Sequence, residues 1–219
     1  MSLRRYSRAV PFNYTTYGMY RLGVTSGIIP ATPLSAGEIF QFRWNPTDRS
    51  IIAIIKRIRV SVAVSTTYFA AGVPLALSLT RASAWSAAGT VGTGITPAAT
   101  CKFDSAMAST ALVAGDCRIA GTDAAGLGAG TKTLEANFIG SVVINQPITA
   151  SVAPPLLLAD LFDDNVGNGG HPIILRAGAA AANAEGIAIR ATAPATGTWR
   201  ASVEIEWAES NSYPYGSSS

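Results

Sequence analysis

The sequence predicts an all-β protein folded as a two-sheet sandwich, and three observations carry this prediction. Residues 198–209 alternate between apolar and polar side chains with the period of two that a half-buried strand requires. Further segments with strand character are separated by turns containing glycine and proline, as in sandwiches and barrels. At 219 residues, the chain is long enough to bury one sizeable core as a single domain.

The first 36 residues predict an extended N-terminal arm. They contain Pro11, Gly18, Gly23, Gly27, Pro30 and Pro33, which interrupt both helices and sheet ladders. An isolated segment of this composition is disordered unless a partner orders it. Arginines and tyrosines are interleaved along the arm, and we expect the partner-binding residues to be Arg4, Arg5, Tyr6, Arg8, Tyr14, Tyr17, Tyr20 and Arg21. The folded domain would then span residues 37–209, and residues 210–219 would form a tail.

Strand segments follow the arm. Residues 39–44 alternate and end in a turn at 45–48. The next strand has an inward face of β-branched residues, Ile58, Val60, Val62 and Val64. Leu75, Leu77 and Leu79 continue in the same period. Residues 81–132 are rich in Ala, Gly, Thr and Ser and fit a short helix at 81–88, loops or short strands equally well, so they carry no assignment.

The remaining segments complete the sandwich. Residues 134–144 have strand character, and the apolar run 155–162 fits either a buried strand or a short helix. Residues 172–176 form another strand after the turn-rich loop 163–170. With about eight strands divided between two sheets, the pattern favours a jelly roll.

The last two strands give the clearest pattern. One face of the final strand collects the apolar residues Trp199, Ala201, Val203, Ile205 and Trp207. Its opposite face collects Arg200, Ser202, Glu204 and Glu206. Residues 187–191 alternate in the same way, and a turn containing Pro194 and Gly197 follows them. The pattern predicts that these two strands pair as a hairpin.

Charge is distributed unevenly along the chain. Residues 1–60 hold nine Lys or Arg and two acidic residues, whereas the rest holds seven basic and eleven acidic residues. This asymmetry favours association of the arm with neighbouring subunits, although a solvated basic tail is the plainer alternative. A basic and aromatic arm also fits nucleic acid, but it lacks a base-reading motif, so we expect docking on protein. Charged residues make up only 13% of the chain, which suits a surface covered by other subunits.

No residue pattern indicates a catalytic site, a cofactor or a metal. His171 is the single histidine, and no nucleophile motif accompanies it. The oxygen-bearing residues of one loop, Asp160, Asp163, Asp164, Asn165 and Asn168, do not match the spacing of a calcium loop. Adjacent Asp163 and Asp164 would point apart, which argues against a polysaccharide hydrolase with two facing carboxylates. The glycine-rich stretches 89–94 and 126–130 lack the ending of a phosphate loop.

Cysteine usage and hydropathy indicate a protein made in a cytoplasm. Cys101 and Cys117 could close a disulfide loop, but reduced thiols fit at least as well. The first five residues lack the apolar core of a signal peptide, and the aliphatic cluster at 51–55 is too short to span a bilayer. We therefore expect no association with a membrane.

Four motifs resemble a group of proteins encoded in tailed-bacteriophage genomes. They are Phe-x-Phe-Arg-Trp at 40–44, Ile-x-Arg-x-Arg-Val at 55–60, Glu-Gly-Ile-x-Ile-Arg at 185–190, and Pro-Ala-Thr-Gly-Thr-Trp with a Glu-Trp-Ala-Glu ending at 194–209. The motifs occur in this order across most of the domain. The resemblance implies a structural protein of the virion, and within that class we favour a capsid cement or decoration protein without catalytic residues.

A decoration subunit needs no chemistry, only interfaces. We expect it to be made in the host cytoplasm, to oligomerise as a homotrimer, and to clamp the major capsid protein or other virion proteins with its arm. The alternative is a tail, neck or fibre component that binds a host glycan or another virion protein.

Overall fold

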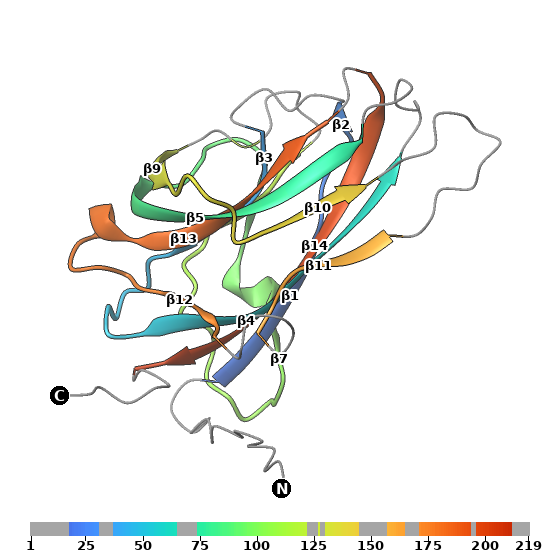
Figure 1. Cartoon of the computed structure of the whole chain (residues 1–219). Helices are drawn as coiled ribbons and strands as arrows, with labels where there is room; N and C mark the ends of the chain where they lie inside the picture. Colours follow the sequence, from blue (N-terminus) through green and yellow to red (C-terminus); the bar gives the residue numbers. More distant parts are fainter. Residues whose placement is uncertain are drawn as a thin grey trace, which may run out of the picture.

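The computed structural model describes residues 18–30, 37–64, 74–121, 127, 130–144, 157–164, 171–193 and 196–211. These residues form two seven-stranded antiparallel sheets that pack face to face (Figure 1). The prediction of an all-β, two-sheet sandwich is therefore confirmed. In the same residues, helical structure is limited to two short 3-10 helices, Pro97–Ala99 and Ala181–Asn183.

Sheet A has the strand order β11-β4-β14-β1-β7. These strands are β11 (Leu157–Asp163), β4 (Ile52–Val64), β14 (Thr198–Ser210), β1 (Gly18–Thr25) and β7 (Cys101–Lys102). Two short strands extend the sheet: β12 (Ile173–Leu175) pairs with β4, and β2 (Ile29–Pro30) pairs with β14. From Leu157 on, the apolar run at 155–162, which fitted a strand or a helix, is thus the strand β11.

Sheet B has the strand order β10-β5-β13-β3-β8-β6. These strands are β10 (Gly140–Ile144), β5 (Leu75–Ala87), β13 (Glu185–Thr192), β3 (Glu38–Trp44), β8 (Cys117–Ile119) and β6 (Thr93–Ile95), and β9 (Thr131–Leu134) pairs with β5. Residues 81–87, for which a short helix was one option, continue the strand β5. Four strand pairs each join an earlier strand to a later one, and the two partners lie closer in sequence from one pair to the next. These pairs are β1–β14, β3–β13, β4–β11 and β5–β10.

The core fills the space between the sheets and is rich in aromatic side chains. Trp44, Trp199 and Trp207 are fully buried there. Phe42 of β3 meets Trp207 of β14 edge to face, with ring centroids 5.3 Å apart, and so joins the two sheets. The predicted inward face of β14 is confirmed, since none of its five apolar side chains is exposed. The inward leucines of β5 are also fully buried.

The predicted terminal hairpin is wrong. β13 lies in sheet B between β5 and β3, whereas β14 lies in sheet A between β4 and β1. Other strands occupy both edges of each, so the chain crosses from one sheet to the other between Thr192 and Thr198. A strand with one face in the core shows the same apolar and polar alternation in two arrangements. The next strand can pair beside it in the same sheet, or it can face it across the core from the other sheet. The pattern therefore could not distinguish the two arrangements.

The predicted arm of 36 residues is too long. Residues 18–25 form β1, which pairs with β14 from Gly18 opposite Glu209 to Thr25 opposite Ser202. Gly23, taken as a breaker, occupies an exposed strand position with open space around it, where a glycine weakens a strand without preventing it. The folded domain therefore begins by residue 18 instead of 37. Residues 1–17, 31–36 and 212–219 lie outside the described part of the chain.

The two sides of the sandwich are closed in different ways. On one side, β8 and β6 extend sheet B beyond β3, and β7 extends sheet A beyond β1. On the other side, the edge strands β10 and β11 approach each other directly. A Cβ atom built on Gly140 would lie 2.0 Å from the carbonyl oxygen of Leu161, so the approach requires a glycine at this position.

Candidate functional site: the outer face of sheet A

The structure describes two of the eight residues that were predicted to bind a partner. Six of them, Arg4, Arg5, Tyr6, Arg8, Tyr14 and Tyr17, lie outside the described residues. Tyr20 and Arg21 are neighbours in β1, so their side chains point to opposite faces of sheet A. Of these two, Tyr20 faces the core and Arg21 faces outward.

Tyr20 belongs to the core and not to a docking arm. Its side chain is fully buried, and its ring centroid lies 5.6 Å from that of Trp207. Its hydroxyl donates a hydrogen bond of 2.9 Å to the carbonyl of Ala108. Burial, together with the nearby carboxyl group of Glu209, raises the pKa of Tyr20. The assignment of Tyr20 to a partner-binding set is therefore corrected, because its inward position in β1 removes it from the surface.

Arg21 lies among charged side chains on the outer face of sheet A. Its guanidinium is 2.6 Å from Glu204 and 3.7 Å from Glu206, both on the adjacent strand β14. The hydrogen bond to Glu204 is the main reason that the pKa of Arg21 is raised. Arg21 therefore stays charged and is held against the sheet.

The ion pairs continue across four neighbouring strands. Arg57 of β4 pairs with Glu206 of β14, and Arg59 of β4 lies 2.6 Å from Asp160 of β11. The register places Glu204 opposite Arg59 and Glu206 opposite Arg57, so opposite charges meet directly across the sheet. We call this surface the charged face; it consists of Arg21, Arg57, Arg59, Asp160, Glu204 and Glu206.

The charged face is electrically balanced and partly open to solvent. Its three arginines match its three carboxylates, and the exposed fractions of these side chains range from 14% on Glu206 to 44% on Asp160. Ion pairs at this exposure contribute about 0–1 kcal/mol each to stability. Such a surface gives a partner a fixed pattern of alternating charge, which favours selectivity and orientation over affinity.

Sequence reasoning placed the side chains at 57, 59, 204 and 206 on outward faces but missed their pairing, and it assigned Arg21 to the arm and Asp160 to a loop. Arginines occur at every second position in residues 57–59, and glutamates occur at every second position in residues 204–206. Two strands with opposite charges in the same period favour pairing side by side. This charge pattern could have led to a prediction of the observed pair β4–β14 in place of the hairpin between β13 and β14.

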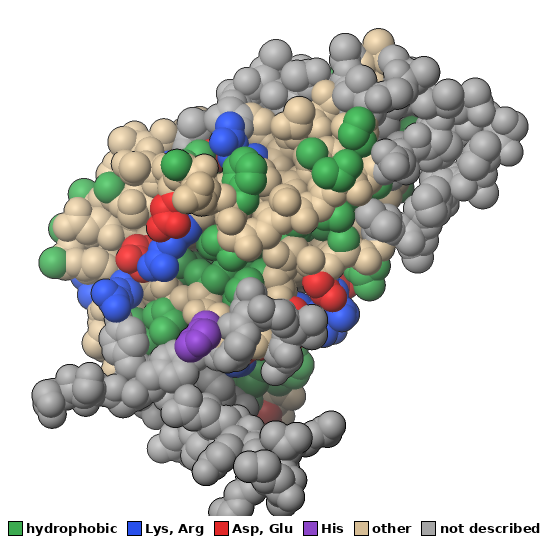
Figure 2. Space-filling model, viewed as in Figure 1, with side chains coloured by type: hydrophobic (Ala, Val, Ile, Leu, Met, Phe, Trp, Pro, Cys, Tyr) green, Lys and Arg blue, Asp and Glu red, His purple; other side chains and the backbone are tan. Residues whose placement is uncertain are grey.

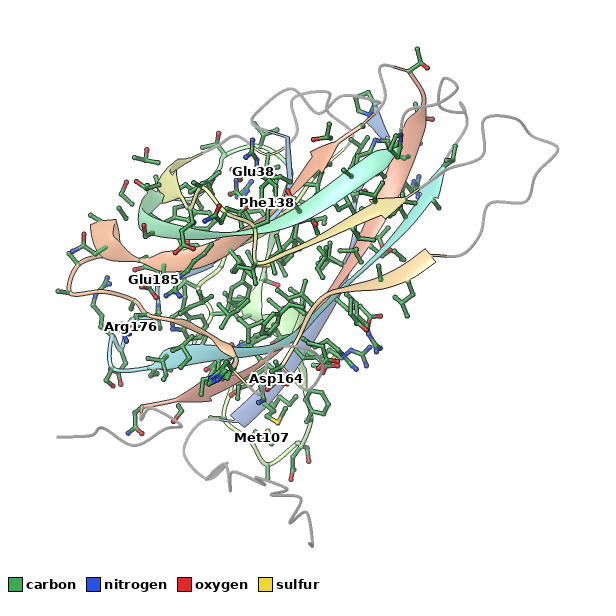
Figure 3. The ribbon with its side chains drawn as sticks, viewed as in Figure 1. Glu38, Met107, Phe138, Asp164, Arg176 and Glu185 are labelled. Atoms are coloured by element: carbon green, nitrogen blue, oxygen red, sulfur yellow. The ribbon has the colours of Figure 1, made fainter. Side chains whose placement is uncertain are left out.

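One end of sheet A holds both ends of the described chain. Gly18, where β1 begins, lies opposite Glu209, near the end of β14. The backbone N–H of Phe103 donates to the carbonyl of Met19, and the backbone N–H of Met19 lies 3.2 Å from the sulfur of Met107. Figure 3 marks Met107 at the beginning of β1. The segments 1–17 and 212–219 therefore join the domain at the same end of the same sheet.

Glu209 ties this end together from inside. Its carboxyl group accepts hydrogen bonds from the hydroxyl of Thr110, from the backbone N–H of Ala111 at 2.9 Å and from the indole N–H of Trp207 at 3.0 Å. Burial nevertheless raises the pKa of Glu209, and the hydrogen bonds offset only part of that shift. The loop before β8 is thus fixed to the strand from which the C-terminal segment continues.

The described residues that were considered for a calcium site or for catalysis do not form a common site, because they form separate ion pairs or lie apart from one another. Asp160 pairs with Arg59, and Asp164, at the end of β11 in Figure 3, pairs with Lys56 of β4. Asn165 and Asn168 lie outside the described residues. His171 precedes β12 and lines a pocket with Glu135 and Arg81. Within the described ranges, no three His, Cys, Asp or Glu side chains come together in a way that could hold a metal ion.

The two cysteines lie in different sheets and carry free thiols. Cys101 is exposed in β7 of sheet A, whereas Cys117 is buried in β8 of sheet B. Burial raises the pKa of the Cys117 thiol, which keeps it protonated and unreactive. The option of a disulfide between them is therefore not the arrangement in this structure.

The comparisons add no family to this description. In the part of the chain that the structure describes, no helix has the length and apolar character needed to cross a membrane. The chain was compared with protein-family models, with curated proteins and with solved structures, and none of the three comparisons found a match.

Proposed function

We propose that the protein is a structural subunit of a tailed-phage particle, namely a non-enzymatic cement or decoration protein of the head. In this proposal the N-terminal arm holds the major capsid protein or another virion protein, and the sandwiches associate with one another as trimers. The protein would be made in the host cytoplasm and would end up in the virion.

One observation carries the docking part of the proposal. The basic N-terminal segment, with Arg4, Arg5 and Arg8, joins the domain at Gly18, beside the last residues of β14. Both terminal segments are therefore attached at one end of sheet A, and its charged face begins three residues further along β1, at Arg21. A single partner surface at this end could contact the arm, the C-terminal segment and the charged face together.

The strand pairing supports a fold suited to this role. If β1, β3, β4, β5, β10, β11, β13 and β14 are numbered one to eight, strand one pairs with eight, two with seven, three with six, and four with five. A long two-stranded ribbon rolled into a sandwich has this order, which supports a jelly roll. Jelly rolls occur in viral capsid proteins and in lectins, so the fold fits the proposed role by analogy.

The four phage-like motifs fall on strands that build the sandwich. In the described residues they cover most of β3, the middle of β4, most of β13, and both the beginning and the end of β14. Phe40, Phe42 and Trp44 are fully buried, as are Ile187, Ile189 and Trp207. The resemblance therefore lies in residues that build the core of the sandwich more than in residues of a binding surface.

Copy number and arm deletion test the proposal together. We expect quantitative mass spectrometry of purified particles to find hundreds of copies of the protein. Deleting residues 2–17 should leave a folded domain, because β1 begins at Gly18, but should abolish attachment to particles. Deleting residues 212–219 is the matched control for loss of a terminal segment.

Several outcomes would contradict this function. A dozen copies or fewer would place the protein in the tail or neck, and equal attachment of the arm-deleted and full-length proteins would remove the docking role. Light scattering should report a trimer in solution or on release from particles, and a monomer in both states would refute the oligomer.

The second candidate, a tail or fibre component that binds a glycan, is favoured by one observation, a pocket between the sheets.

A further inference from the structure

A pocket of about 330 Å³ opens between the two sheets, at the end where β5 faces β12. Its apolar floor includes Ile139, Phe162 and Ile173, its polar rim includes Arg81, Glu135 and His171, and Pro172 completes the lining. In Figure 2, hydrophobic side chains surround a hollow between the histidine and a group of charged side chains. The charged face lies on the outside of sheet A, so the pocket is a separate site.

The polar rim is held in a fixed position. Arg81 donates hydrogen bonds to Glu185 at 2.9 Å and to the carbonyl of Ile174 at 3.1 Å. Glu185 also accepts a hydrogen bond of 2.9 Å from the backbone N–H of Arg176, and Figure 3 shows these two residues close together. Arg81 therefore links β5 of sheet B to β12 of sheet A at the pocket.

Glu135 differs from Glu185 because it is available to a ligand. Its side chain is 53% exposed, and the nearest guanidinium nitrogen of Arg81 is 3.8 Å away, beyond hydrogen-bond distance. The backbone N–H of Glu135 donates to the carbonyl of Arg81 at 3.0 Å, so the residue is fixed in place while its carboxylate reaches solvent. Such a carboxylate can accept hydrogen bonds from hydroxyl groups.

We propose that this pocket binds a neutral saccharide residue. A sugar ring has an apolar face that suits the floor of Phe162 and Ile173, and hydroxyl groups that suit a carboxylate and a guanidinium. The volume of about 330 Å³ is within the range of small-ligand sites. Two carboxylates, Glu135 and Glu185, surround the single guanidinium of Arg81, so the local charge disfavours acidic sugars and phosphate.

Binding of defined sugars to the full-length protein tests the inference. Saturation-transfer NMR and calorimetry would use the methyl glycosides of glucose, galactose, mannose and N-acetylglucosamine, with glucuronic acid and inorganic phosphate as the anionic probes. We expect at least one neutral glycoside to bind at or below about 10 mM and both anions to bind more weakly.

Two matched variants show whether binding occurs in this pocket. Glu135→Gln keeps the size of the side chain but removes its charge, and should weaken sugar binding about tenfold or more. Glu204→Gln makes the same change on the charged face and should leave sugar binding unchanged. Thermal melts of both variants establish that each is folded.

The inference would be overturned if no neutral glycoside bound, if an anion bound more tightly than every neutral sugar, or if Glu135→Gln bound like the parent protein. None of these outcomes depends on attachment of the arm to particles. Failure of the pocket and failure of the decoration role can therefore be distinguished.

Discussion

The outer faces of the two sheets use similar polar residues in opposite ways. On sheet A, the arginines and carboxylates of the charged face are partly exposed and pair in solvent. On sheet B, the polar side chains of β3 are buried: Glu38 and Gln41 are fully buried, and Arg43 is 6% exposed. The segment from Trp85 to Lys132 provides many of the groups that contact these side chains.

Burial turns the polar groups of β3 into structural links. Arg43 donates hydrogen bonds to Asp116 at 2.9 Å and to the carbonyls of Trp85, Ser86 and Ala181. Lys132 lies 2.9 Å from Glu38 and 4.6 Å from the ring centroid of Trp85. An ion pair on an open face adds little to stability. Removing one partner of a buried pair, in contrast, leaves the other charge buried with neither its partner nor water around it. The two faces should therefore respond very differently to mutation.

The largest expected effect is at Arg43. Arg43→Met should lower the free energy of unfolding by about 3–5 kcal/mol, because it removes the buried positive charge beside Asp116 and a hydrogen-bond donor to three carbonyl groups. Arg21→Met, on the charged face, is the matched control and should lower it by less than about 1 kcal/mol. Urea denaturation of both variants measures the difference. Equal losses in the two variants would mean that the arginines of the two faces contribute equally to the free energy of unfolding, and the proposed difference between the faces would be wrong.

The sequence alone predicted the strands better than their surroundings. Alternation identified the inward faces of β4, β5 and β14, because side-chain direction follows directly from strand geometry. It also assigned Gln41 and Arg43 to the face opposite Phe40 and Phe42. Whether that face meets water or protein depends on residues more than 40 positions away, such as Trp85 and Asp116. No pattern within β3 contains this information.

The candidate sites were less predictable than the fold. Tyr20 looked like an arm residue because glycines and prolines surround it, yet its partner strand lies at the far end of the chain. The pocket combines Glu135 and Ile139, which lie between β9 and β10, with residues of β5, β11 and β12. Single polar residues that meet only through long-range strand pairing leave no local motif.

A second contrast concerns two glycines, Gly140 where the edge strands β10 and β11 approach each other and Gly23 at an exposed position of β1. Gly140→Ala should lower the free energy of unfolding by about 1–3 kcal/mol, since the new methyl group would overlap the carbonyl oxygen of Leu161. Gly23→Ala adds the same methyl group where no atom lies within 4 Å, and should be neutral or stabilising by up to about 1 kcal/mol. Chemical denaturation would contradict this contrast if the two substitutions had the same effect.

Glu209 offers a pH-dependent test at the terminal end of sheet A. Because burial raises the pKa of Glu209 in the folded protein, its contribution to stability is full below the ordinary carboxyl pKa and is lost as pH rises through the raised value. Glu209→Gln cannot ionise, so its stability relative to the parent should increase with pH across this interval. We expect a smaller effect than at Gly140, measurable by urea denaturation from acidic to neutral pH.

Thr110→Val separates the titration of Glu209 from loss of a contact. The hydroxyl of Thr110 donates to Glu209 and lowers the pKa of its carboxyl group, so removing this hydroxyl should raise that pKa further. The fall in stability with pH should then extend to higher pH than in the parent. If neither variant changed the pH dependence, Glu209 would not be the group responsible.

The smallest effect on stability is expected on the charged face, and it connects stability to function. Glu204→Gln should lower the free energy of unfolding by less than about 1 kcal/mol, and added salt should reduce even that difference, because the pair with Arg21 is partly exposed. If the face contacts a partner in the particle, the same variant should weaken attachment although the isolated protein is barely destabilised. Denaturation of the free protein and a particle-binding assay, performed on the same preparation, separate the two roles. A variant that attaches like the parent would mean that the charged face is only a solvated surface, and docking would then depend on the arm.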